Sequence, residues 1–341
     1  MLIFCTLFDS FYLDKGIVMY QSIAENTKSF KLYVLCMDDR AYSILSDLAF
    51  DNLVPINLHN FMTPELISAR ENRSRAEFCW TCSSCIIEYV LDTYGEDICT
   101  YIDADLYFYK DPTVLFEELG NASIGIIEHR NNPNFEGKYY DRIAGPYCVE
   151  FNTFRNDENG RTALKWWKNQ CLKCCTAEKN GKTFGDQKYL EDWPTRFRGV
   201  HVYENLGAGM APWNVAQYKL TAMSRIQIEK REVIPVFYHF HAIEYISEEL
   251  ININVYYRSF KTDEKLVNYL YYPYLNKIKD TRMMLEKKYG MNYNVGKKEN
   301  KKEFKEVIKK LAKKRTVEDI VVWLNVSLKK IFFHSKDILS I

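Results

Sequence analysis

The chain has 341 residues, of which 47% are hydrophobic and 15% aromatic, so it can bury a large core and lacks the composition of a disordered protein. Its net charge of +1 hides an asymmetry, because residues 297–341 carry 13 Lys/Arg and 6 Asp/Glu whereas residues 1–296 carry 33 and 39. There is no apolar run of about 18 residues and no basic leader, so we expect a cytoplasmic protein without a membrane span or signal peptide, and no nucleic-acid partner.

Strand and helix patterns alternate in the N-terminal part of the chain. Strands are predicted over residues 2–8, 31–37 and 53–58, with helices between them that end near Asn26 and Phe50. This alternation indicates an α/β, Rossmann-like fold with a mixed, mostly parallel sheet and helices on both faces.

The stretch CTYIDADLYFYKDP at residues 99–112 carries the clearest functional signal. Residues two apart on a strand project to the same side, so Asp103 and Asp105 should point together from a strand end. Ligands of parallel sheets bind at such ends, and Asp9 occupies another one. Two adjacent carboxylates are costly unless a divalent cation compensates them, and the small Ala104 would let a ligand approach the backbone. The alternative is a solvated turn between two strands.

Cysteines provide a competing signal. A C-x-x-C-x-x-C run and a later group of three have spacings that occur in zinc and iron–sulfur sites. However, the first run lies in EFCWTCSSCIIEYVLDTYG, a pattern that predicts a helix ending at Gly95 with the thiols on one apolar stripe. Core packing and a cysteine-cluster metal-binding protein with a structural DAD turn therefore stand as alternatives. The cysteines concerned are Cys79, Cys82, Cys85, Cys171, Cys174 and Cys175.

Neither G-x-G-x-x-G nor G-x-x-x-x-G-K-[ST] follows the first strand, which argues against a dinucleotide dehydrogenase and a P-loop enzyme. Five segments instead occur in a fixed order: FCTLFDSFYLDKG, YIDADLYFYKDP, VEFNTF, GDQKYLEDWP and YHFHA. With these motifs the chain resembles GT-A fold glycosyltransferases, and most closely glycosyltransferase family 8 and related bacterial surface-polysaccharide transferases. The resemblance covers about residues 1–245, which we expect to form the catalytic domain.

The resemblance implies a nucleotide-sugar donor, most simply a UDP-sugar, held at the end of the first strand. Tyr12 would stack its ring on the base, although ordinary surface packing is the alternative for this residue. Arg75, with its neighbours Arg70 and Arg73, would reach the diphosphate or the acceptor, or else belong to a solvated charged loop. The positions implied for nucleotide binding at this end are Thr6, Leu7, Phe8, Asp9 and Tyr12, joined by Asp103, Ala104 and Asp105 of the DAD triplet.

The resemblance also implies a metal site and a sugar site. Asp103 and Asp105 match the metal-binding carboxylates and His239 matches the third ligand. His241 would share a face with His239 if YHFHA is a strand, and the motif favours His239. A histidine ligand favours Mn²⁺ over Mg²⁺. The positions that match contacts to the transferred sugar are Asn152, Asp186 and Gln187, and helix N-capping is an equal alternative for Asp186.

The resemblance implies a retaining transfer to a glycan or lipid-linked acceptor, but the chain departs from the family pattern in three places. Phe154 and Ala242 stand where the family usually has glycine. The downstream Lys-Pro-Trp is absent, and AGMAPWN at residues 208–214 supplies a different turn. These departures bear on the subfamily, the acceptor and the stereochemistry more than on the donor.

Beyond the motifs, we expect a helical extension over residues 246–296, packed on the catalytic domain, and a basic amphipathic tail over residues 297–341. Apolar residues from 303 onward recur at helical spacing among lysines, and Trp323 lies on a second such pattern. This indicates that residues 303–333 contact an anionic membrane at its inner face. The alternative is docking on the body of the protein or on a second subunit of an oligomer.

Overall fold

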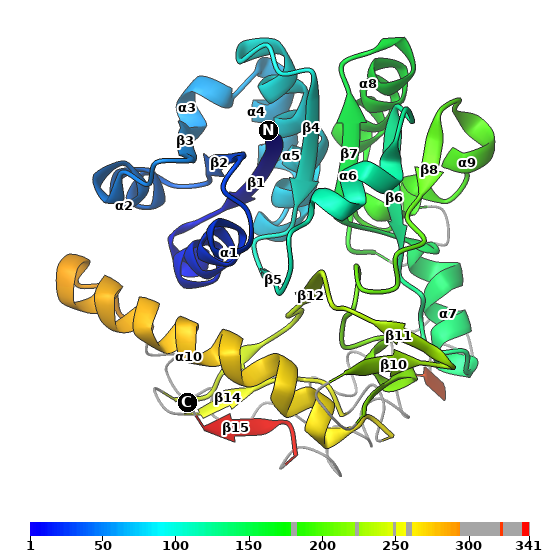
Figure 1. Cartoon of the computed structure of the whole chain (residues 1–341). Coiled ribbons are helices and arrows are strands. Elements are labelled where there is room, and N and C mark those ends of the chain that lie inside the picture. The colour runs from blue at the N-terminus through cyan, green and yellow to red at the C-terminus, as the bar shows by residue number, and fades with distance from the viewer. Residues whose placement is uncertain are drawn as a thin grey trace.

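The computed structural model describes residues 1–178, 183–221, 225–247, 250–256, 261–293, 321–322 and 336–340 (Figure 1). The α-helices are α1 (Leu13–Asn26), α2 (Asp39–Leu48), α3 (Leu58–Phe61), α4 (Pro64–Glu71), α5 (Arg75–Thr93), α6 (Thr113–Leu119), α7 (Phe135–Ala144), α8 (Glu158–Lys173), α9 (Trp193–Arg196) and α10 (Glu264–Tyr289). Short 3-10 helices are η1 (Ser10–Tyr12), η2 (Gln187–Leu190) and η3 (Val215–Gln217).

The strands form four sheets. Their bounds are β1 (Leu2–Phe8), β2 (Phe30–Cys36), β3 (Leu53–Asn57), β4 (Ile98–Ile102), β5 (Leu106–Phe108), β6 (Ile124–Glu128), β7 (Tyr147–Arg155), β8 (Val200–Val202), β9 (Tyr218–Leu220), β10 (Ile226–Ile228), β11 (Arg231–Val233), β12 (Phe237–His239), β13 (Glu244–Tyr245), β14 (Leu250–Asn252) and β15 (Ile338–Ser340). The three strands predicted at the N-terminus are therefore found within one residue of their expected bounds.

The largest sheet has seven strands in the order β3-β2-β1-β4-β7-β6-β8. Neighbouring strands from β3 to β4 are parallel, as are β6 and β8, whereas β7 runs antiparallel to both β4 and β6. Parallel strands need crossover connections, which the intervening helices supply. The predicted α/β fold with a mixed, mostly parallel sheet is confirmed.

Strand β1 shows how this sheet is covered on both faces. Phe4 and Phe8 pack in one buried cluster with α1, α2 and α6. Ile3 and Cys5 point the opposite way and pack in a second cluster with α3, α4, α5 and α8. A strand buried on both faces is expected to be almost wholly apolar, as LIFCTLF is.

The C-terminal elements form a third layer against this body. In Figure 1, β5 and β12 lie between the seven-stranded sheet and the long helix α10. Buried residues of α10 pack with Tyr107 of β5 and Tyr238 of β12 in one cluster, and Val18 of α1 joins them. The extension predicted as helical at residues 246–296 thus contains α10 but begins with a strand, β14.

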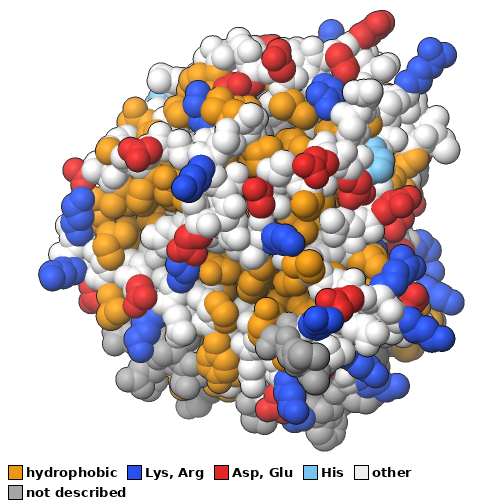
Figure 2. Space-filling view, viewed as in Figure 1, with side chains coloured by type: hydrophobic (Ala, Val, Ile, Leu, Met, Phe, Trp, Pro, Cys, Tyr) orange, Lys and Arg blue, Asp and Glu red, His pale blue; other side chains and the backbone are white. Residues whose placement is uncertain are grey.

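The predicted tail is only partly described. Residues 336–340 include β15, which pairs with β14, so this end of the chain lies on the body rather than in a free tail. The membrane-contacting segment predicted at 303–333 falls outside the described residues, apart from Val321 and Val322. Among the helices that are described, none combines the length and hydropathy needed to cross a membrane. Figure 2 shows acidic and basic side chains interspersed on one face of the molecule.

Asp337 fixes this C-terminal strand to the body and provides a test of the packing. Its buried carboxylate accepts hydrogen bonds from the main-chain nitrogens of Val255 (2.7 Å) and Tyr256 (2.8 Å). Asp337→Ala leaves both buried donors unsatisfied, so we expect it to lower the free energy of unfolding by about 2–4 kcal/mol. Urea denaturation measures this loss. The exposed Asp280→Ala serves as the control, and equal stability of the two variants would contradict this role for Asp337.

Candidate active site

Asp103, Asp105 and His239 converge at the carboxyl end of β4. The Nε2 atom of His239 lies 3.1 Å from Asp105 Oδ1 and 3.8 Å from Asp103 Oδ2. We predicted that the two aspartates project from a strand, but they lie in the turn between β4 and β5. In this turn Leu106 N donates to Asp103 O (3.3 Å). The turn is not a solvated one, because Asp105 is buried and Asp103 is only partly exposed.

The pairing of β5 with β12 brings the histidine to the turn. Leu106 is the partner of His239 in this antiparallel ladder, and Phe240 N donates to Asp105 O (2.9 Å). His241 lies beyond the end of β12, and its ring meets that of His239 edge-on at 5.5 Å between centroids. Asp103, Asp105 and His239 form a group that could hold a metal ion, and His241 belongs to no such group among the described residues.

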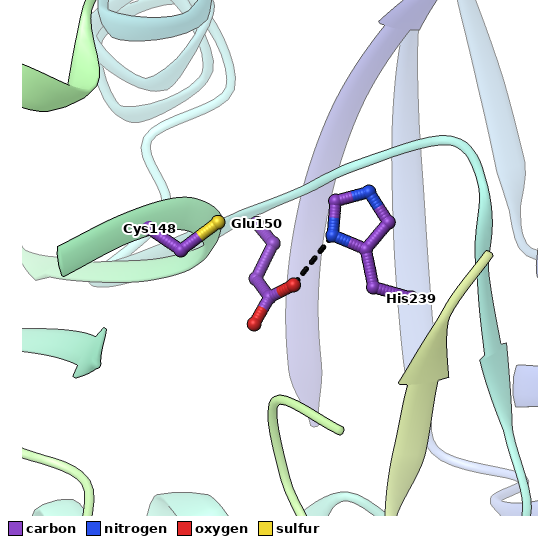
Figure 3. Close-up of side chains that lie close together, drawn as sticks. All are labelled: Cys148, Glu150 and His239. Atoms are coloured by element: carbon purple, nitrogen blue, oxygen red, sulfur yellow. Dashed lines mark hydrogen bonds and ion pairs between the residues drawn. The ribbon is translucent and has the colours of Figure 1, made fainter. Parts of the chain in front are cut away.

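Glu150 of β7 holds the other side of the His239 ring, which the sequence did not predict. Its Oε2 lies 2.5 Å from His239 Nδ1, as the dashed line in Figure 3 shows, and its side chain is fully buried. Cys148 lies beside this pair and completes a second group of ligand-type side chains. A carboxylate on one ring nitrogen orients the imidazole and leaves the other nitrogen facing the site.

The charges of this cluster are strongly coupled. Burial raises the pKa of Asp103 to about 7. Burial also acts to raise the pKa of Asp105, but the charge and hydrogen bond of His239 outweigh it and lower that pKa to about 2. Burial acts to lower the pKa of His239, yet Asp105 and the hydrogen bonds around the ring hold it well above 6.5. Asp105 and His239 thus stabilise each other's charged form, whereas burial opposes the charge of Asp103.

The donor set fits a divalent cation. One atom from each of Asp103, Asp105 and His239 lies within 4.8 Å of the others, and carboxylate oxygen with imidazole nitrogen suits Mn²⁺. Three carboxylates face a single imidazole once Glu150 is counted, so the cluster carries excess negative charge in a buried place. Such charges are normally paired or bound to a metal.

A cavity of about 290 Å³ opens from Asp103 and His239 and reaches Asp186. Its walls are largely aromatic, which suits a ligand with apolar ring faces and a few polar groups. The Nδ1 atom of His129 in this wall is buried and has no hydrogen-bond partner. The residues that line the cavity are Trp80, Tyr101, Asp103, His129, Asn131, Tyr140, Ala144, Cys148, Val149, Phe184, Gly185, Asp186, Gln187, Trp213, His239 and His241.

The residues predicted to contact the sugar divide into two groups. Asp186 and Gln187 line the cavity, and Ser83 Oγ donates to Asp186 Oδ2 (2.5 Å) while Gln187 Nε2 donates to Ala144 O (3.3 Å). Asp186 makes no side-chain capping bond to the η2 helix that follows, so the capping alternative is wrong. Asn152 is fully buried in β7 and is not among the lining residues, so the structure does not bring it to the cavity.

The residues predicted to hold the nucleotide follow β1. Asp9 caps η1 by accepting from Phe11 N (2.9 Å), and its carboxylate forms an ion pair with Arg75. Thr6 is buried with its hydroxyl unpartnered, and Tyr12 is 40% exposed. The side chains of Leu7 and Phe8 pack in the core instead, so only their backbone is available to a ligand. The structure thus pairs Asp9 with Arg75 and bonds the backbone of Tyr12 to that of Asp9, and it leaves Leu7 and Phe8 inside.

The cysteine run lies on α5, as the helical alternative predicted. Cys82 and Cys85 are buried between α5 and the sheet, and burial raises the pKa of Cys85 to about 12. Across the described residues, neither group of candidate metal ligands contains more than one cysteine. All ten thiols are free. The arrangement supports core packing rather than a thiolate metal cluster.

Several residues of the site carry weak sequence signals. Glu150 lies two positions before Asn152 in VEFNTF and is the single carboxylate of a largely buried strand, which could have indicated a buried partner. Trp213, in the APWN turn, packs edge-on against the rings of His239 and His241 and donates to His129 O (2.9 Å). An isolated tryptophan gives no indication from sequence alone of which histidines it meets.

Two proteins of Bacillus subtilis (strain 168), both described as uncharacterized, are similar to this chain. YfnD is 34% identical over 280 residues, which cover 81% of this chain and 88% of YfnD. The chain belongs to the YfnD family. YfnF is 30% identical over 279 residues, which cover 79% of this chain and 89% of YfnF. No protein-family model matches the chain.

The structure of this YfnD-family chain is also similar to several solved structures. The galactosyltransferase LgtC, in complex with donor and acceptor sugar analogs, is 15% identical with a TM-score of 0.49, covering 71% of this chain and 87% of LgtC. Mouse xyloside xylosyltransferase 1 is 11% identical with a TM-score of 0.46, covering 71% of this chain and 98% of that protein. Likenesses at this level carry no conclusion about the reaction.

The carboxyl group of Asp186 allows a pH test of the site. Burial raises its pKa to about 6, above the usual 3.8, so its ionisation opposes folding above about pH 6 and this penalty disappears toward pH 4. Asp186→Asn should therefore raise the free energy of unfolding by on the order of 2–3 kcal/mol at pH 8, and by progressively less as the pH falls. Urea denaturation across this range, with the exposed Asp51→Asn as control, measures the effect. A gain that is independent of pH would contradict it.

Proposed function

We propose that the protein is a metal-dependent glycosyltransferase that moves a sugar from a nucleoside-diphosphate sugar to a glycan or lipid-linked acceptor. One observation carries the proposal: Asp103, Asp105 and His239 meet at the carboxyl end of β4, at one end of the cavity that reaches Asp186. A metal site next to a sugar site is what such a transfer requires, and this arrangement supports the proposal. The five motifs, in their order, are the independent support from the sequence.

The chemistry requires stabilisation of a leaving diphosphate. The bond between the anomeric carbon and the diphosphate oxygen breaks, the acceptor hydroxyl oxygen forms the new bond to that carbon, and the hydroxyl proton passes to the leaving diphosphate. In the transition state negative charge grows on the leaving oxygen and the sugar becomes oxocarbenium-like. Mn²⁺ or Mg²⁺, held by Asp103, Asp105 and His239, supplies Lewis-acid stabilisation of this charge when bound. Glu150 keeps Nε2 of His239 turned toward the two aspartates by accepting from Nδ1. The resemblance favours Mn²⁺ and UDP.

The cavity accounts for the sugar half of the reaction. Asp186 and Gln187 line the cavity and offer hydrogen-bonding groups to the sugar, and the aromatic side chains of the wall would exclude water from the reacting carbon. Ser83 holds the Asp186 carboxyl in place. The motif resemblance adds two parts to the proposal. The transfer retains the anomeric configuration, and Asn152 takes part by acting from beneath the cavity wall.

The remaining parts of the proposal concern where the acceptor lies. A lipid-linked acceptor would be met at the inner face of a membrane, and the basic residues of 303–333 would hold the enzyme there. Docking of that segment on a second subunit is the alternative. Co-sedimentation with anionic vesicles at low and high salt separates these two roles, because only the membrane role gives salt-sensitive pelleting.

Removing either carboxylate tests the metal site. Asp103→Asn and Asp105→Asn should each abolish transfer. Asp103→Asn should leave the thermal unfolding temperature unchanged or higher, because burial disfavours the charge that it removes. Asp105→Asn should lower the unfolding temperature, because it breaks the buried ion pair with His239. A thermal-shift screen of nucleotide-sugars with Mn²⁺ identifies the donor, and sugar release from that donor measures activity. Near-normal activity of both variants at saturating donor would exclude the metal assignment, and a wild-type protein that binds no nucleotide-sugar would contradict the whole proposal.

The two histidines form a matched pair for the third ligand. His239→Ala should raise the Mn²⁺ concentration for half-maximal activity by at least about 10-fold, because it removes a ligand that Glu150 has oriented. His241→Ala should have a smaller effect, because the His241 ring lies beside the ligand group without belonging to it. The reverse ranking in Mn²⁺ titrations would transfer the assignment to His241.

A further inference from the structure

Lys15 lies next to the candidate metal site and has no assigned role. It belongs to the first turns of α1, and only 5% of its surface is exposed. Its ammonium group sits between two aromatic rings, 4.1 Å from the ring centre of Tyr12 and 4.9 Å from that of Tyr245. Val18, three residues further along α1, packs with Tyr107 of β5, the strand that begins directly after Asp105, so the first turns of α1 lie beside the turn that carries the aspartates.

The ammonium group of Lys15 lacks an anionic partner. In the described part of the chain, no carboxylate lies within 4.0 Å of it, and its contacts with the rings of Tyr12 and Tyr245 are cation–π contacts. The neighbouring Asp14 is occupied elsewhere, because it accepts from Tyr245 Oη (2.6 Å) and lies 4.0 Å from Arg282 Nε. Aromatic faces stabilise a desolvated cation by less than its burial costs, so an anion is the missing partner.

We propose that the ammonium group of Lys15 binds phosphate oxygens of the donor's diphosphate, beside the metal held by Asp103, Asp105 and His239. This inference rests on the proposed function. A diphosphate carries more negative charge than one divalent ion neutralises, so a second cation is required on the side of the phosphates that the metal leaves open. Lys15 offers such a cation between Tyr12, expected beneath the base, and Asp105, expected on the metal.

The surroundings of Lys15 explain how it is kept in place. Tyr245 forms one wall, and its hydroxyl is anchored on the fully buried Asp14. Arg282 of α10 lies over the Tyr245 ring, 4.2 Å from its centre. Helix α10 thereby supports Tyr245, and Tyr245 positions Lys15 of α1. Lys15 is thus a binding residue of the donor site, and Tyr245 is a positioning residue.

Calorimetric binding tests this role without requiring the acceptor. The ligands are UDP, UMP and inorganic pyrophosphate, each with Mn²⁺, and Mn²⁺ alone. Lys15→Met keeps the length of the side chain and removes the charge, so we expect UDP and pyrophosphate to bind about 10- to 100-fold more weakly while Mn²⁺ binds as before. Lys15→Arg should retain most of the affinity. Lys31→Met is the matched control, because Lys31 of β2 also lies over a tyrosine ring, 5.7 Å from the centre of Tyr33, but pairs with Glu96 in the segment between α5 and β4.

Stability separates a binding role from a structural one. If Lys15 serves the ligand, Lys15→Met removes a costly buried charge, so its unfolding temperature without ligand should equal or exceed that of the wild type. A lower unfolding temperature with unchanged UDP affinity would show a structural lysine and overturn the inference. If the wild type and Lys15→Met bind UDP and pyrophosphate with equal affinity, the inference about Lys15 is overturned and the proposed function stands. Wild-type protein that binds neither ligand overturns the proposed function as well.

Discussion

The pairing of two three-residue strands, β5 and β12, determines the geometry of the site. Because Leu106 is the partner of His239, the turn before one strand lies beside the end of the other. A slip of one residue would turn His239 to the opposite face and separate its ring from the aspartates. Such short strands are marginal alone, so this register depends on packing, in which Phe108 meets Phe237 and α10 covers Tyr107.

Charge balance explains why these side chains can be buried together. Around His239 the structure gathers three carboxylates, and the imidazolium compensates only part of their charge. At Lys15 the imbalance has the opposite sign, because a buried ammonium group faces aromatic rings without an ion pair. A divalent cation would correct the first imbalance and a diphosphate the second. A metal–nucleotide complex would therefore correct both at once, and binding of either part alone would be weaker.

Sequence patterns predicted the parts of the structure that depend on local chemistry. The alternation of apolar strands and helices indicated the sheet, and helical spacing explained Cys82 and Cys85 as core residues. The DAD triplet and His239 were found through motifs, although the strand argument for the triplet was wrong because a turn brings the carboxylates together. Glu150 was not predicted, since its contact with His239 joins residues of β7 and β12 that are far apart in sequence.

The boundary expected at residue 245 divides the chain by motif but not by packing. All five motifs lie before it, yet Tyr245 stands at the boundary, and Arg282 supports it from α10. Further along, Asp337 holds the backbone at Val255 and so ties β15 to the segment that follows β14. Motifs report residues that touch ligands, whereas the support for Lys15 comes from residues that touch only protein. Supporting residues of this kind follow no fixed spacing in sequence, because different C-terminal elements can supply the side chains that pack around Lys15.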